Sequence, residues 1–168
     1  ESVMEWVQKK QVEALENVIF FSPDDYFSSY EMIKRAKFVM IYNSTIGLEA
    51  SVMWAPVLCA GKARFTQLKT VFFPPSKAAY LQTLSEFLAV DEIHIPDEHR
   101  ENARRFLFYQ LYRTSLPFDR FIEPDNIWPG YVKLKEFTWQ DLLPENSTTL
   151  RVITEGLLEG KDFLLSED

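Results

Sequence analysis

The sequence predicts an α/β fold: a Rossmann-like open, mostly parallel sheet flanked by helices, with a helical C-terminal portion. Residues 38–42 (FVMIY) are apolar throughout, as in a strand covered on both faces of a parallel sheet. A helical pattern follows over 44–54, and a second apolar run follows Pro56 over 57–60. This order of strand, helix and strand is typical of a compact βαβ unit.

Three elements are expected before this unit. Val3, Trp6 and Val7 recur at helical spacing and predict an amphipathic helix over 2–16. The apolar run that follows Asn17 predicts a strand over 17–21. A helix is then expected from residue 28 or 29 to about residue 37, because serine is a favoured N-cap.

The rest of the chain is expected to be largely helical. Apolar residues at helical spacing and the Pro74-Pro75 and Pro96 breaks set the boundaries. The expected elements are a short strand over 70–73, helices over 76–89 and 97–115, mostly loop with short pieces over 116–145, and a last helix over 147–159.

Composition limits the function classes. Hydrophobic residues make up 46% of the 168-residue chain and aromatic residues 15%, which is typical of a folded domain. The net charge of -7 argues against a general nucleic-acid partner, because phosphate backbones require a basic surface. Cys59 has no second cysteine to pair with, so a reducing, cytoplasmic location is expected. We expect residues 1–168 to form a single lobe, the C-terminal part of a longer protein.

A polar turn follows the first strand of the βαβ unit. Asn43, Ser44 and Thr45 come at its carboxyl end, where open α/β sheets form their ligand crevice. The helix that follows would present free N–H groups to a phosphate, and Gly47 would leave room for a ligand or a strand. Glu49 would accept hydrogen bonds from a ribose diol. In the alternative interpretation, Asn43 or Ser44 is an ordinary N-cap and Glu49 is a solvated helix residue.

A basic turn follows the second strand and is expected at the same sheet edge. It contains Gly61, Lys62 and Arg64, and its cations are suited to pairing with a phosphate or a sugar carboxylate. The alternative is a solvated basic turn without a ligand. No metal site is expected, because His94 and His99 have no neighbours at a recognised ligand spacing and are expected at the surface or an interface. No cofactor is expected either.

The stretch SSYEMIKRAKFVMIYNSTIGLEASVMWAPVLCAGKARF, residues 28–65, resembles the C-terminal lobe of capsule polysaccharide biosynthesis and surface-carbohydrate glycosyltransferases. A weaker likeness reaches LRVITEGLLEGKDF at 150–163. The resemblance implies one lobe of the two-lobed glycosyltransferase B fold, with Ser44, Thr45 and Glu49 at donor-binding positions. It also implies that the acceptor and the catalytic base belong to a missing N-terminal lobe, so that this chain alone is inactive.

The implied partners are a CMP- or UDP-linked nucleotide sugar, the missing lobe and a saccharide acceptor, with peripheral membrane association of the full protein. Many members of the family carry a His-Pro pair upstream of the motif, and this sequence has none. That departure favours a second hypothesis, a Rossmann-like interaction module that has lost ligand binding. A third is a lobe of a nucleotide-sugar epimerase.

Several aromatic residues cluster near the helix expected over 97–115. They suggest either an interlobe contact or, by default, buried core. These residues are Phe106, Phe108, Tyr109, Tyr112 and Trp128.

Overall fold

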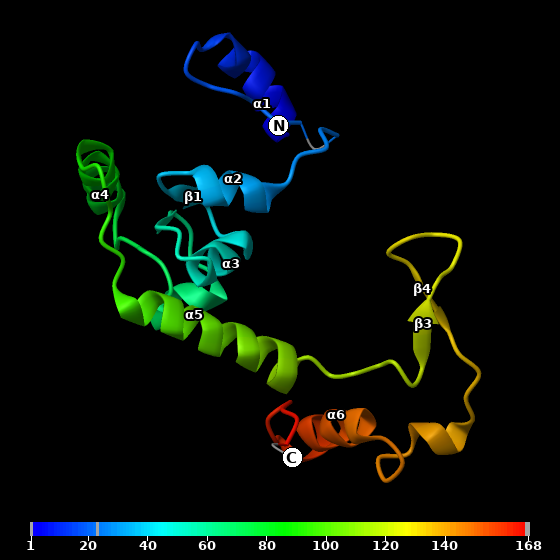
Figure 1. Cartoon of the computed structure of the whole chain (residues 1–168). Helices are drawn as coiled ribbons and strands as arrows, with labels where there is room; N and C mark the ends of the chain where they lie inside the picture. The colour runs from blue at the N-terminus through cyan, green and yellow to red at the C-terminus, as the bar shows by residue number, and fades with distance from the viewer. Residues whose placement is uncertain (1, 23, 167–168) are drawn as a thin grey trace. The chain divides into compact units, whose positions relative to one another are not determined.

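The computed structural model describes residues 2–22 and 24–166. The chain divides into two compact units, Glu1–Ala36 and Lys37–Asp168, which are described separately (Figure 1). The single lobe expected over 1–168 stays a prediction.

The first unit contains two short helices. Helix α1, Val3–Lys9, begins with a capping box in which the Ser2 side chain accepts from the Glu5 N–H and the Glu5 carboxylate accepts from the Ser2 N–H. The helix expected over 2–16 stops early, because Gln11 adopts a left-handed φ of 49°. A 3₁₀ turn, η1 (Val12–Ala14), follows, and helix α2, Ser29–Arg35, confirms the prediction made from Ser28 or Ser29.

The strand expected over 17–21 is wrong. These residues form a turn and an extended segment with no strand assigned, and the Ile19 side chain is 81% exposed. An apolar run forms a strand only when a neighbouring strand accepts and donates its backbone hydrogen bonds. Among the described residues of this unit, none pairs with residues 17–21 as a strand.

The second unit contains the predicted βαβ arrangement. Strand β1, Val39–Ile41, pairs in parallel with β2, Val57–Cys59, and α3, Ile46–Val52, connects them. All three β2 residues are buried, whereas Met40 in β1 is 51% exposed. The expected cover on both faces therefore holds for β2 and fails for β1. The fold is mixed α/β, and the described part of the chain contains two sheets of two strands each.

The strand expected over 70–73 is reduced to one parallel bridge between Leu58 and Phe72. Phe72 donates its N–H to the Val57 carbonyl and accepts from the Cys59 N–H, both at 2.9 Å. Pairing ends there because Pro74 and Pro75 have no N–H to donate. The parallel pair is thus extended by a single residue.

Two long helices follow this bridge. They are α4, Lys77–Ala89, and α5, Asp97–Tyr109, which continues as a π-helical turn over Gln110–Thr114 (η3). Phe72 contacts the Phe87 ring at 5.0 Å and the His99 ring at 4.8 Å between centroids. His99 is therefore buried, and the prediction that both histidines lie at the surface or an interface is wrong for this one.

The C-terminal part contains a hairpin and a last helix. Strands β3, Ile122–Pro124, and β4, Val132–Leu134, pair antiparallel within the region expected to be mostly loop. The 3₁₀ helix η4, Trp139–Leu142, and helix α6, Thr148–Glu159, follow. Helix α6 confirms the last helix expected over 147–159; the Ser147 side chain caps it, and Gly160 ends it with a left-handed φ of 69°.

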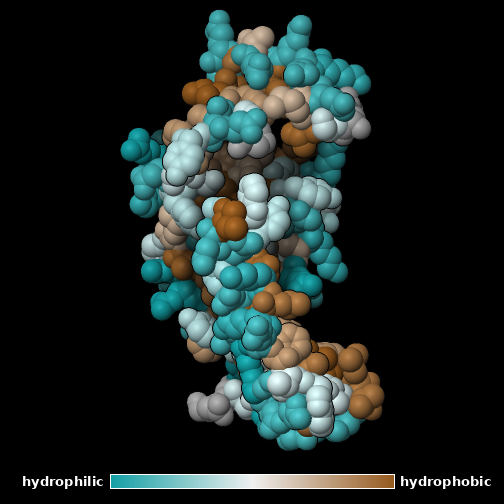
Figure 2. All heavy atoms as spheres, turned by 90° about the vertical axis from the view of Figure 1, so that its right-hand side faces the viewer, coloured by the Kyte–Doolittle hydropathy of each residue, from teal (hydrophilic) through white to brown (hydrophobic). Residues whose placement is uncertain are grey.

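Hydrophobic side chains reach the surface in several places, and Figure 2 shows them interspersed with hydrophilic ones. On the β3–β4 hairpin, Ile127, Val132 and Leu134 are all exposed. Within residues 2–22 and 24–166, no helix has both the length and the apolar composition that crossing a bilayer requires.

Candidate functional site

The parallel segments of the second unit end at one edge. Because β1, β2 and the bridged residue Phe72 run in the same direction, their carboxyl ends lie together. The Ala60 N–H donates to the Ile41 carbonyl at 2.9 Å, and the Gly61 N–H donates to the Tyr42 carbonyl. The turn after β1 and the turn after β2 are therefore neighbours, as the sequence predicted.

Tyr42 and Gly61 hold these two turns together. A Cβ built on Gly61 would lie 2.9 Å from the Tyr42 carbonyl oxygen and 3.0 Å from its ring carbons, so only glycine fits without a shift. The Cys59 thiol donates to the same carbonyl at 3.2 Å. Sequence reasoning did not select Tyr42, although an aromatic residue directly before the polar turn was visible.

The polar turn itself is open to solvent. Asn43, Ser44 and Thr45 are all exposed. The Ser44 hydroxyl accepts from the Ile46 N–H at 3.4 Å, a long hydrogen bond, and Thr45 precedes α3 without a side-chain cap. The alternative of an N-cap thus applies weakly to Ser44, and the three polar side chains face water.

Gly47 and Glu49 lie within α3. A Cβ on Gly47 would come 2.2 Å from the Ile41 Cδ1 and 3.3 Å from the Val57 Cγ1. Gly47 therefore allows α3 to approach the two strands and is buried against them, away from solvent. Glu49, one turn beyond Thr45, is half-buried.

The basic turn is partly ordered by its own hydrogen bonds. Thr66 accepts from the Ala63 N–H at 3.2 Å and donates to the Ala63 carbonyl at 2.8 Å. This contact begins the 3₁₀ helix η2, Arg64–Leu68. Lys62 and Arg64 are both exposed, and Lys62 lies next to the Tyr42–Gly61 contact.

A cavity of about 300 Å³ opens at the same edge, a size at the lower end for small-ligand sites. It lies between the end of β2 and the start of α4, and its polar lining comes from Ser76, Lys77 and Tyr80. The Ser76 hydroxyl accepts from the Ala79 N–H at 3.2 Å and caps α4. Sequence reasoning missed these residues because they reach the edge only through the Leu58–Phe72 bridge.

Burial affects two titratable groups near this cavity. It raises the pKa of Tyr80, and the neighbouring Cys59 raises it further. Burial also raises the pKa of Cys59, while a hydrogen bond involving the Gly61 backbone opposes that rise. The Cys59 thiol is therefore neutral near pH 7 and has a structural role.

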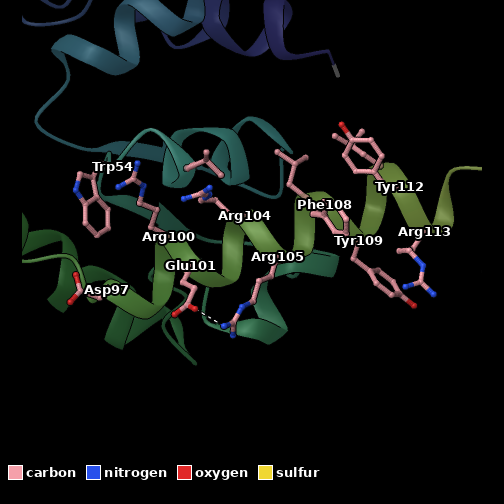
Figure 3. Close-up of a pocket in the computed structure, with 13 residues that line it drawn as sticks. Trp54, Asp97, Arg100, Glu101, Arg104, Arg105, Phe108, Tyr109, Tyr112 and Arg113 are labelled. Atoms are coloured by element: carbon pink, nitrogen blue, oxygen red, sulfur yellow. Dashed lines mark hydrogen bonds and ion pairs between the residues drawn. The ribbon is translucent and has the colours of Figure 1, made fainter. Parts of the chain in front are cut away.

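A second and larger hollow, about 970 Å³, runs along α5 and η3 (Figure 3). Aromatic side chains expected to be core by default line it: Phe108, Tyr109 and Tyr112 are exposed by 59%, 44% and 63%. The core interpretation is wrong for these three. They recur at helical spacing along α5 and η3, and their side chains reach solvent.

Comparison of the chain with family models, with curated proteins and with solved structures found no match. The sheet edge and the groove along α5 are therefore the features from which function is inferred.

Proposed function

We propose that this chain is the nucleotide-sugar donor-binding lobe of a glycosyltransferase for capsule or surface polysaccharide, and that its sheet belongs to a Rossmann-like fold. One observation carries the proposal. The parallel segments that end at Ile41, Cys59 and Phe72 share an edge with a cavity of about 300 Å³. Open α/β folds bind their ligands at that edge.

The side chains at this edge suit a nucleotide phosphate. Ser44 and Thr45 offer exposed hydroxyl donors, and Lys62 and Lys77 offer exposed cations from the two flanking segments. These cations would offset the phosphate charge locally although the chain as a whole carries a net charge of -7. Glu49 would accept hydrogen bonds from the ribose diol.

In this proposal the lobe stabilises the departing nucleotide phosphate, which is the electrostatic part of sugar transfer. Turnover requires the missing N-terminal lobe, which supplies the acceptor site and the catalytic base. The full protein works in the cytoplasm and associates with the membrane periphery. Its donor is a CMP- or UDP-linked sugar.

An amide chemical-shift titration of the chain with CMP, UDP and GDP at millimolar concentration tests the proposal. We expect localised shifts at residues 43–49 and 60–64, with a Kd of about 1 mM, near 4 kcal/mol. Lys62→Ala should weaken binding by about tenfold, since hydrogen bonds to charged groups contribute about 1.5 to 3 kcal/mol. Lys10→Ala, an exposed lysine of the first unit, is the matched control. If none of the three nucleotides causes localised shifts, the proposal that this chain is a donor-binding lobe is rejected.

A second candidate function is an interaction module without nucleotide binding. The groove along α5 favours it, because its aromatic side chains are exposed. In that case the titration would leave the sheet edge unchanged.

A further inference from the structure

The groove along α5 carries two rows of side chains at intervals of four residues. Figure 3 shows one row on the side of α5 that faces Trp54 and the other on the opposite side. The first row is Arg100, Arg104, Phe108 and Tyr112; the second is Asp97, Glu101, Arg105, Tyr109 and Arg113. The first row therefore changes from charged to aromatic along the helix, and the second is charged except for Tyr109.

The charged end of the groove is built around Arg100 and Trp54. The Arg100 guanidinium carbon lies 5.0 Å from the centroid of the Trp54 ring. Its Nε is buried and has no hydrogen-bond partner among the described residues. Trp54 takes a left-handed φ of 68°, which is uncommon for a bulky residue. This backbone turn brings the indole to the start of the groove.

Arg104 and Arg105 extend the positive surface. Arg105 forms an ion pair with Glu101 at 2.5 Å, whereas no described carboxylate pairs with Arg104. Arg104 is exposed. Guanidinium groups bind carboxylates through two parallel hydrogen bonds, so Arg104 is suited to an anionic ligand.

The aromatic end offers flat apolar surfaces. The Phe108 and Tyr112 rings are 5.0 Å apart between centroids, with an interplanar angle of 36°. Tyr109 lies in the neighbouring row and is also exposed. Such rings combine large apolar faces with polar hydroxyl tips. The C–H face of a pyranose ring packs on a surface of this kind while its hydroxyl groups remain free to hydrogen-bond.

The length of the groove favours a linear ligand. Residues 97 to 113 span about 24 Å at about 1.5 Å per residue, so one small anion would occupy only a fraction of it. Asp97 and Glu101 lie in the same groove as the arginines. Sugar hydroxyls can donate to these carboxylates, and the net charge of -7 disfavours a nucleic acid. Helix backbones line the groove, so an extended peptide would find few main-chain partners there.

We infer that the groove along α5 binds a linear acidic glycan, with ring carboxylates at Arg100 and Arg104 and sugar faces on Phe108, Tyr109 and Tyr112. The inference rests on the proposed function and deepens it: the groove binds an internal stretch of the glycan that the transferase extends, while the end that reacts enters the acceptor site of the missing N-terminal lobe. It places the glycan on α5 and the nucleotide at the sheet edge, so the two sites can be tested separately.

The test is a titration of the 168-residue chain, followed by tryptophan fluorescence and amide shifts, with a tetramer of galacturonic acid. Maltotetraose is the neutral control, and decaglutamate and a ten-nucleotide thymidine strand are the other anions. We expect saturable binding of the acidic tetramer alone, with shifts along residues 97–113. Arg104→Gln should weaken it about tenfold or more, and Arg151→Gln on α6 should leave it unchanged.

Three results would overturn the inference. One is no binding of the acidic tetramer by the unaltered chain. Another is equal binding by the Arg104→Gln variant. Because Arg104 is exposed, weaker binding by this variant would not be due to misfolding. The third is binding of decaglutamate or the thymidine strand as tight as that of the glycan, which would assign the groove to acidic peptides or to polyanions in general. A nucleotide titration without shifts at residues 43–49 would reject the donor site at the sheet edge. It would leave the measured binding of the glycan to the groove unaffected.

Discussion

The Ser51 hydroxyl donates to the Thr70 carbonyl at 2.6 Å, and both residues are buried. Thr70 in turn donates its hydroxyl to the Phe65 carbonyl at 2.8 Å. These two hydrogen bonds connect the end of α3 to the segment that carries Phe72. They therefore help to hold the third parallel segment at the sheet edge.

Ser51→Ala should lower the free energy of unfolding by about 1 to 3 kcal/mol, because the substitution leaves the buried Thr70 carbonyl without this donor. Urea denaturation would measure the change. Ser85→Ala on α4 is the matched control: its hydroxyl also donates to a carbonyl, that of Leu81, but the group is exposed. The control should change stability by no more than about 0.5 kcal/mol. Equal effects of the two substitutions would contradict the role given to Ser51.

Gly47→Ala should also destabilise the fold. The new Cβ would meet the Ile41 Cδ1, and such overpacking costs about 1 to 3 kcal/mol, against a gain of about 1 kcal/mol in helix propensity. Ile41→Val removes that methyl group and by itself should cost about 0.5 to 1.5 kcal/mol. The double variant should lose less stability than the sum of the two single losses, by at least about 0.5 kcal/mol. Strict additivity would show that the contact is not the cause.

His99 should make stability depend on pH. Burial lowers its pKa from the ordinary value of 6.5; Glu98 opposes that effect and Lys69 adds to it. Below pH 6.5 the unfolded chain therefore binds a proton that the folded chain does not, and stability falls as the pH falls until the lower folded pKa is passed. We expect urea midpoints to decrease between about pH 7 and pH 5.

His99→Gln should remove this component of the pH dependence, whatever its effect on stability at pH 8. His94→Gln replaces the other, exposed histidine and should leave the slope unchanged. If the His99→Gln variant keeps the full dependence of the urea midpoint on pH, that dependence comes from other titratable groups.

The sequence identified the elements whose signals are local. β1, α3 and β2 were predicted because an apolar run, a helical pattern and Pro56 follow one another within a short stretch. Helices α4 and α6 were predicted because their apolar residues recur at helical spacing. The β3–β4 hairpin was missed because all three β4 residues are exposed, so the pattern that marks a half-buried strand is absent.

The candidate site was predicted in part. The polar and basic turns were expected at one edge, since parallel strands end together, and the Tyr42–Gly61 contact joins them. The cavity next to them depends on Phe72 bridging to Leu58, a contact without a local signal. Gly47 was selected correctly as a position of close approach. Of the two neighbours expected there, a ligand or a strand, the structure shows the strands β1 and β2.

The sequence by itself determined that this chain has a βαβ unit with polar and basic turns after its strands, because hydrophobic runs and breakers act over a few residues. The tertiary structure alone decided which of the candidate residues lie close together. It brought Ser76, Lys77 and Tyr80 to the sheet edge, buried His99 against Phe72, and placed Trp54 against Arg100 at the start of an exposed groove. The physical reason is that each of these contacts joins segments distant in the chain, and the contacts form only when α3, α4 and α5 pack on the strands.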